Sequence, residues 1–148
     1  LVFTSSSNSY DVSVDINSFD PNFALSKLGN HFKLSETRGN YVIVNFWTSD
    51  DAEARIRNIH YDRFFKSIGK NLSFISVNFD DSDNMFKELV RTDGLSEVSQ
   101  FYEKDGMESE VYKRYRLKSG MNSYLLDKDG KILAINPTQQ QLTKYFCQ

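Results

Sequence analysis

The sequence contains one cysteine in 148 residues, Cys147, next to the C-terminus. A single thiol cannot form an intrachain disulfide, so a disulfide framework is excluded as the basis of the fold. The cysteine count does not determine the cellular compartment, because a secreted protein large enough to form a hydrophobic core can be stable without disulfides.

Long apolar runs are also absent. None approaches the roughly 20 residues that span a bilayer, and no basic, apolar and small-residue sequence at the start is typical of a signal peptide. We expect a soluble chain. The sequence opens without methionine, and its polar stretch 4–9 is typical of a tether left when a longer precursor is trimmed.

Charge of one sign is not in excess either. Eighteen Lys and Arg against 20 Asp and Glu leave a net charge of -2, which favours neither a nucleic acid nor an anionic membrane as partner. Hydrophobic residues make up 39% and aromatic residues 14% of the chain, more than a disordered chain carries. We expect one compact domain over residues 21–148, preceded by an extended polar lead-in or tether over residues 1–20.

Apolar runs of strand length alternate with helical periodicity in the middle of the chain. Two short apolar pieces around Gly29 and Asn30 predict an N-terminal hairpin. The continuous apolar runs 41–47 and 72–79 predict two buried strands. The apolar spacing between them predicts a helix that Gly69 ends, and strand, helix, strand implies a parallel right-handed crossover.

The start of that helix is acidic. Asp50 and Glu53 have the spacing of a capping box, and acidic side chains in a first turn complement the helix dipole. Beyond the second strand the pattern predicts a helix after the polar cluster 80–84, an irregular excursion through Gly94 and Gly106, a helix over 108–117, an antiparallel hairpin of 122–126 and 131–135, and a last helix over about 139–147.

Several local sequences resemble one family in the right order. Residues 41–49, Tyr-Val-Ile-Val-Asn-Phe-Trp-Thr-Ser, are similar to the strand and aromatic pair before the active-site loop of TlpA- and ResA-like redoxins, and Arg55 falls on their basic residue after the motif. Residues 115–117 and 123–132 are similar to the family's segment before and through its β-hairpin. The resemblance covers about residues 23 to 146.

The chain is thus identified as a thioredoxin-superfamily domain of the AhpC/TSA-redoxin type. The resemblance implies an α/β fold, a three-layer α/β/α sandwich with a central mixed sheet and an N-terminal β-hairpin extension. It also implies a family of extracytoplasmic thiol-disulfide oxidoreductases, in a periplasmic or membrane-tethered setting such as that of a lipoprotein with a lipid-anchored precursor.

The departures from the family concern its catalytic residues. Asp51 and Ala54 stand at the two positions of the Cys-x-x-Cys motif, and Met121 stands at the cis-proline that presents backbone to an extended substrate. A carboxylate cannot attack a disulfide, and a non-proline cis bond costs about 2.5–4 kcal/mol. We expect no disulfide exchange and, at Met121, a trans bond or at least a remodelled loop. Thr48 keeps the Thr-x-x-Cys spacing of peroxiredoxins, but the thiol is missing.

The resemblance therefore favours a redox-inactive module that binds an unknown protein or peptide and needs no cofactor or metal. Its candidate binding residues surround the degenerate site: Trp47, Asp50, Asp51, Glu53, Arg55 and Met121. Two alternatives stay open. One is an enzyme of another class or a metal site built on Asp50, Asp51, Glu53 and Arg55, which burial and a raised carboxyl pKa would favour. The other is a structural or oligomerising domain.

The remaining candidate residues are better explained structurally. Aspartates 80, 81 and 83 resemble a calcium loop but lack its glycine and distal glutamate, so we predict a solvated turn. His31 and His60 have no companion metal ligands, and Cys147 has no basic neighbour that would lower its pKa. Four aromatic residues form either a ligand cleft or, as we favour, part of the core: Trp47, Tyr112, Tyr115 and Tyr124.

Overall fold

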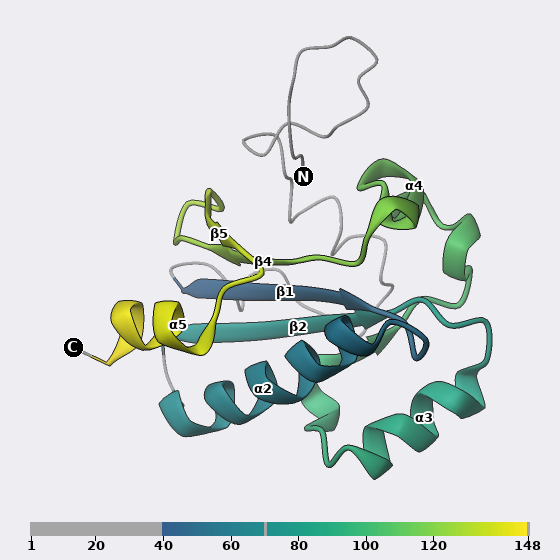
Figure 1. Cartoon of the computed structure of the whole chain (residues 1–148), viewed down its shortest axis with the longest axis horizontal. Helices are drawn as coiled ribbons and strands as arrows, with labels where there is room; N and C mark the ends of the chain where they lie inside the picture. Colours follow the sequence, from purple (N-terminus) through teal and green to yellow (C-terminus); the bar gives the residue numbers. More distant parts are fainter. Residues whose placement is uncertain (1–39, 70, 148) are drawn as a thin grey trace, which may run out of the picture.

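The computed structural model describes residues 40–69 and 71–147. Within them a mixed five-stranded sheet has the order β3-β2-β1-β4-β5 (Figure 1). β1 (Tyr41–Trp47), β2 (Leu72–Asn78) and β3 (Gln100–Tyr102) are parallel, whereas β4 (Ser123–Leu126) and β5 (Ile132–Ile135) continue the sheet in antiparallel pairs. The predicted α/β class, the parallel crossover and the antiparallel hairpin are confirmed.

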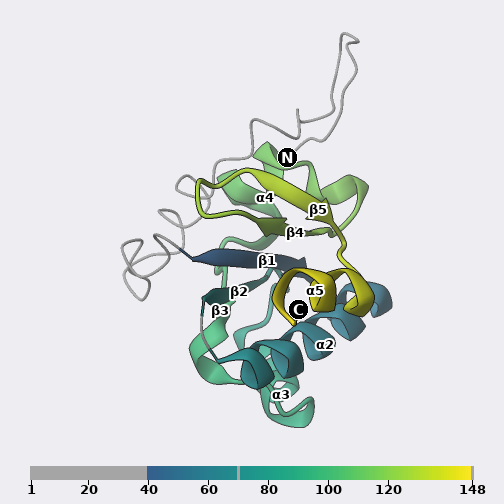
Figure 2. The same ribbon diagram turned by 90° about the vertical axis from the view of Figure 1, so that its left-hand side faces the viewer.

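Helices cover both faces of this sheet. α2 (Ala52–Ile68) and α5 (Gln139–Phe146) lie together on one side of the strands (Figure 2), where Tyr61, Phe64 and Leu142 pack against Ile43 and other strand residues. α3 (Asp83–Thr92) lies beside α2, and its Phe86 packs against Trp47 there. α4 (Glu110–Arg114) covers the opposite face, which presents the alternate side chains of β1. The sheet is therefore the middle layer of three.

The ends of the helices follow from local chemistry. Gly69 closes α2 with φ of 77° and donates its N–H to the Phe65 carbonyl at 3.1 Å, as predicted. The residue that caps the start of α2 is Asp51, not Asp50. Ser82 caps α3, and Thr138 forms a capping box with Gln141 at α5.

Two predictions between β2 and β4 were wrong in detail. The helix expected over 108–117 is only α4, flanked by the 3-10 turns Gly106–Glu108 and Leu117–Ser119. Ser109 caps α4 through the Tyr112 N–H, so no helix continues across it, and Arg116 adopts a left-handed φ of 55° that ends it. The irregular excursion contains the 3-10 turn Glu97–Ser99 and the edge strand β3, which is too short to produce a period-two pattern.

The N-terminal hairpin, the lead-in and His31 lie outside the described residues. What positions the site is the direction of the strands, because β1 and β2 are parallel and their carboxyl ends meet at one edge of the sheet. In Figure 1 this edge lies at the right, where α2 begins.

Candidate functional site

The turn between β1 and α2 places Asp51 at the first position of the family motif. Asp51 has an extended backbone, and its carboxylate accepts a hydrogen bond from the Ala54 N–H at 3.0 Å. This is the geometry of a helix N-cap, which satisfies an otherwise unpaired helix donor. Ala54 is fully buried beneath it.

Asp80 fixes that turn to the end of β2. Its carboxylate accepts from the Ser49 backbone N–H at 3.0 Å and from the Ser49 hydroxyl at 3.2 Å. The Asn78 side chain donates to the other carboxylate oxygen at 3.0 Å. Asp80 is therefore a structural link between two loops rather than a solvated turn residue.

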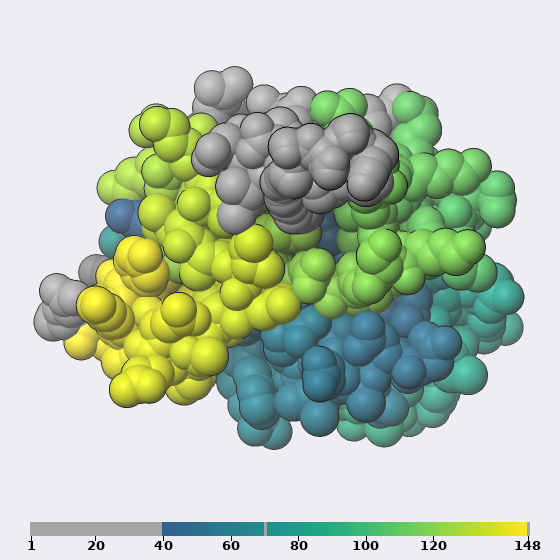
Figure 3. Space-filling view, turned by 45° about the horizontal axis from the view of Figure 1, so that its top comes forward, coloured from purple at the N-terminus to yellow at the C-terminus, as the bar shows by residue number. Residues whose placement is uncertain are grey.

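The loop before β4 forms the opposite side of the site. Arg57 reaches from α2 and donates through Nη2 to the Met121 carbonyl at 2.7 Å, while the next carbonyl, of Asn122, accepts from the Phe46 N–H at 3.2 Å. No peptide bond among residues 40–69 and 71–147 is cis, so the trans bond expected at Met121 is present. Figure 3 shows the surface of the residues that follow α4 bordering the blue surface of α2.

A groove of about 670 Å³ opens between these elements. One side is the turn 48–53, and the other is formed by Met107, Tyr112, Leu117, Lys118, Gly120 and Met121, with Phe79, Asp80 and Asp81 between them. Burial and the nearby Asp50 carboxylate raise the pKa of the Tyr112 phenol. The groove thus combines an acidic side with an apolar side.

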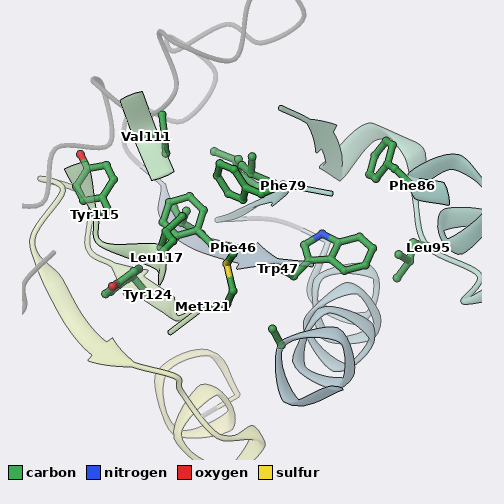
Figure 4. Packing of buried hydrophobic residues seen from close by; sticks show 14 of the residues in the cluster. Phe46, Trp47, Phe79, Phe86, Leu95, Val111, Tyr115, Leu117, Met121 and Tyr124 are labelled. Carbon is green, nitrogen blue, oxygen red and sulfur yellow. The ribbon is translucent and has the colours of Figure 1, made fainter. Parts of the chain in front are cut away.

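The structure brings four of the six predicted binding residues together on this groove, namely Asp50, Asp51, Glu53 and Met121. Trp47 has no exposed surface and does not line the groove, and its ring lies 6.3 Å from that of Phe86 (Figure 4).

Arg55 does not line the groove. Its guanidinium forms a bidentate ion pair with Asp93, at 2.7 and 2.8 Å, which ties α2 to the end of α3. The hydrogen bond to Asp93 raises the pKa of Arg55. Arg55 therefore stabilises the contact between α2 and the end of α3.

The aromatic candidates separate in the same way. Tyr115 and Tyr124 are buried beside Phe46, with ring centroids 6.1 and 6.3 Å from it, so these two belong to the core, as favoured from the sequence. Tyr112 is half-buried and lines the groove. Figure 4 shows Met121 beside Phe46 in the core, and Met121 also lines the groove.

The other candidates lie apart. Asp83 pairs with Lys87 at 3.1 Å, His60 is exposed on α2, and Cys147 is exposed beyond α5. In the described part of the chain no three His, Cys, Asp or Glu side chains converge as metal ligands.

Sequence reasoning missed the structural roles of Arg57 and Asp80. The position of Asp80 after a buried parallel strand was a usable signal, because such strand ends gather at one edge of a sheet. The hydrogen bond from Arg57 to the Met121 carbonyl joins residues 64 positions apart, so no local sequence pattern could predict it.

Comparison with known proteins agrees with this architecture, a mixed sheet with helices on both faces and a groove beyond β1, which defines a thioredoxin-like domain. Residues 16–135 match the AhpC/TSA family, and the chain belongs to that family. Within the thioredoxin superfamily it is a TlpA/ResA-like domain.

The similar proteins are bacterial. A thioredoxin-like protein from Parabacteroides distasonis shares 35% identity with a TM-score of 0.71, covering 74% of this chain and 82% of that one. A thiol-disulfide oxidoreductase from Bacteroides fragilis shares 26% identity with a TM-score of 0.59, covering 73% and 80%. The thiol-disulfide oxidoreductase ResA of Bacillus thuringiensis is 28% identical over 134 residues, 85% of this chain and 73% of ResA.

No helix within residues 40–69 and 71–147 combines the length and apolar character needed to cross a membrane.

Proposed function

We propose that this protein is a redox-inactive member of the TlpA/ResA-like group that binds a protein or peptide in the groove beside its degenerate motif. The observation that carries the proposal is that both positions of the Cys-x-x-Cys motif hold residues with structural roles. Asp51 caps α2 and Ala54 is buried under the cap, yet the groove in front of them is open.

The chemistry supports inactivity. Disulfide exchange needs a thiolate that attacks one sulfur, holds a mixed disulfide and is then released by a second thiol. A carboxylate and a methyl group supply neither step. The sole thiol, Cys147, follows α5, at the opposite end of the strands from the start of α2 in Figure 1.

The groove supports binding. In the family the loop at the cis-proline position presents its backbone to an extended substrate, and here the corresponding loop is held in place by Arg57 and lines the groove with Gly120 and Met121. A groove of about 670 Å³ lies within the size range of ligand sites.

An enzyme of another class receives less support. Such an enzyme would need buried carboxylates with a cationic partner, whereas Asp50 and Glu53 are exposed and Arg55 is paired with Asp93. On the family resemblance we also propose an extracytoplasmic or membrane-tethered location.

Reduction of insulin by dithiothreitol tests the proposal. Four proteins are compared with a protein-free blank: the wild type, Cys147→Ser, the double variant Asp51→Cys/Ala54→Cys, and that double variant with Met121→Arg. We expect the wild type and Cys147→Ser to match the blank and the double variant to accelerate reduction. Met121→Arg should remove the gain, because it fills the groove that receives the extended chain.

Either of two results would refute the proposal. Acceleration by the wild type above the blank would show a redox activity, and its loss in Cys147→Ser would assign it to that thiol. A double variant that stays active with Met121→Arg would show that polypeptides do not enter through the groove.

A further inference from the structure

We infer that the groove selects a basic partner segment, a stretch of another polypeptide that carries lysine or arginine next to an apolar side chain. This inference rests on the proposed function and adds the chemical class of the partner.

The apolar side of the groove offers surface to such a segment. Met107 is 58% exposed and Tyr112 is half-buried, while Phe79, Leu117 and Met121 form a buried floor. An exposed methionine adapts to different apolar side chains, and an aromatic ring also attracts a cation.

The other side is acidic and has no cationic partner. Its acidic rim consists of Asp50, Asp51, Glu53, Asp80 and Asp81, and among the described residues Lys118 is the one cation that lines the groove with it. Among residues 40–69 and 71–147 none of the five carboxylates forms an ion pair.

The hydrogen bonds of the acidic rim leave its charge in place, because their donors are neutral. Asp50 accepts from the Thr48 hydroxyl at 2.6 Å, and Asp51 and Asp80 accept from backbone and neutral side-chain groups. The nearby Arg55 and Arg57 are directed to Asp93 and to the Met121 carbonyl.

The whole chain has a net charge of only -2, so negative charge is concentrated at the groove. A concave surface with one sign of charge attracts a ligand of the opposite sign.

Charge also argues for a partner rather than the chain's own N-terminal part. The first 26 residues contain three aspartates and no lysine or arginine. The whole segment 1–39 contains three basic residues, Lys27, Lys33 and Arg38, against four acidic residues, so it carries no net positive charge. The complementary charge is therefore expected in trans.

Fluorescence anisotropy tests the inference with the full chain and three labelled peptides of equal length, which alternate leucine with lysine, glutamine or glutamate. We expect the lysine peptide to bind best, the glutamate peptide worst, and added salt to weaken the lysine peptide most. Glu53→Gln/Asp81→Asn should weaken the lysine peptide about fivefold, the scale of two exposed ion pairs, and leave the glutamine peptide unchanged.

The matched control is Glu97→Gln/Asp129→Asn, which removes the same charge from two exposed residues outside the groove. Equal binding of the lysine and glutamine peptides would overturn the basic-segment inference while leaving groove binding intact. Equal weakening by the two double variants would also overturn it, because only net charge would then matter. The insulin experiment judges the proposed function separately.

Discussion

On the face of the sheet that α4 covers, β1 presents Val42, Val44 and Phe46, and all three belong to one apolar cluster. On the face under α2 the same strand presents Ile43 and then Asn45, which has no exposed surface. Two equally buried faces are thus built from different chemistry.

The polar half of the α2 face is a connected layer. The Ser76 hydroxyl donates to Asn58 Oδ1 at 2.6 Å, and the Asn58 and Gln100 amides exchange two hydrogen bonds of 3.2 Å. Asn45 donates to Ser76 at 3.3 Å, and its Oδ1 is the one side-chain acceptor of these four residues without a hydrogen-bond partner among the described residues. Buried polar groups are tolerated when each finds a partner, and such networks demand one arrangement of their elements. The comparison suggests that apolar packing supplies most of the stability and that the polar layer fixes how α2 sits on the sheet.

The largest expected effect comes from opening a cavity on the apolar face. Phe46 packs against Phe79 with centroids 5.7 Å apart and also contacts Tyr115 and Tyr124. Phe46→Ala should lower the free energy of unfolding by about 3–5 kcal/mol, measured by urea denaturation. Val98→Ala, at a side chain that is 76% exposed, is the control and should change it by less than about 0.5 kcal/mol. A small loss at Phe46 would mean that this face is loosely packed.

The polar layer should respond differently. Asn58→Ala leaves the Ser76 hydroxyl and the Gln100 amide without their partner inside the core, so we expect a loss of about 2–4 kcal/mol. A double-mutant cycle with Ser76→Ala should give a coupling energy of about 0.5–3 kcal/mol. Arg63→Ala, at an exposed position of α2, controls for helix propensity. Strict additivity of Asn58→Ala and Ser76→Ala would contradict the connected layer.

The two faces also differ in how well the sequence predicted them. Continuous apolar runs predicted β1 and β2, because the side chains on both faces of these strands are buried. Asn45 and Ser76 are polar residues within those runs. Ser76 donates to Asn58, which is on a helix that only the tertiary fold brings near. The pattern therefore predicted the strands but not the polar layer.

The groove, too, was predicted from the sequence only in part. The family resemblance gave the positions of Asp51, Ala54 and Met121, and local charge gave an acidic helix start, though the N-cap lies one residue further along than the spacing of Asp50 and Glu53 predicted. On the apolar side the sequence offered Met121 as a binding residue and Tyr112 as a possible cleft residue. Met107 was not predicted, because it lies in a 3-10 turn that precedes the helix expected over 108–117.

The smallest expected effect extends the comparison to a buried ionisable group. Glu103 follows β3 with 6% exposure, and burial raises its pKa, although the Asp105 N–H donates to its carboxylate at 2.9 Å. A raised pKa in the folded state means that Glu103 supports folding fully at low pH, and that this contribution is lost as pH rises through the folded pKa.

Glu103→Gln keeps an acceptor for Asp105 but has no charge to bury. Its stability relative to the wild type should therefore increase from about pH 4 to pH 7, measured as the shift in urea midpoint at each pH. The exposed Glu97→Gln should show a constant difference near zero. A difference for Glu103→Gln that is independent of pH would mean that Glu103 is as well solvated in the folded protein as a surface glutamate.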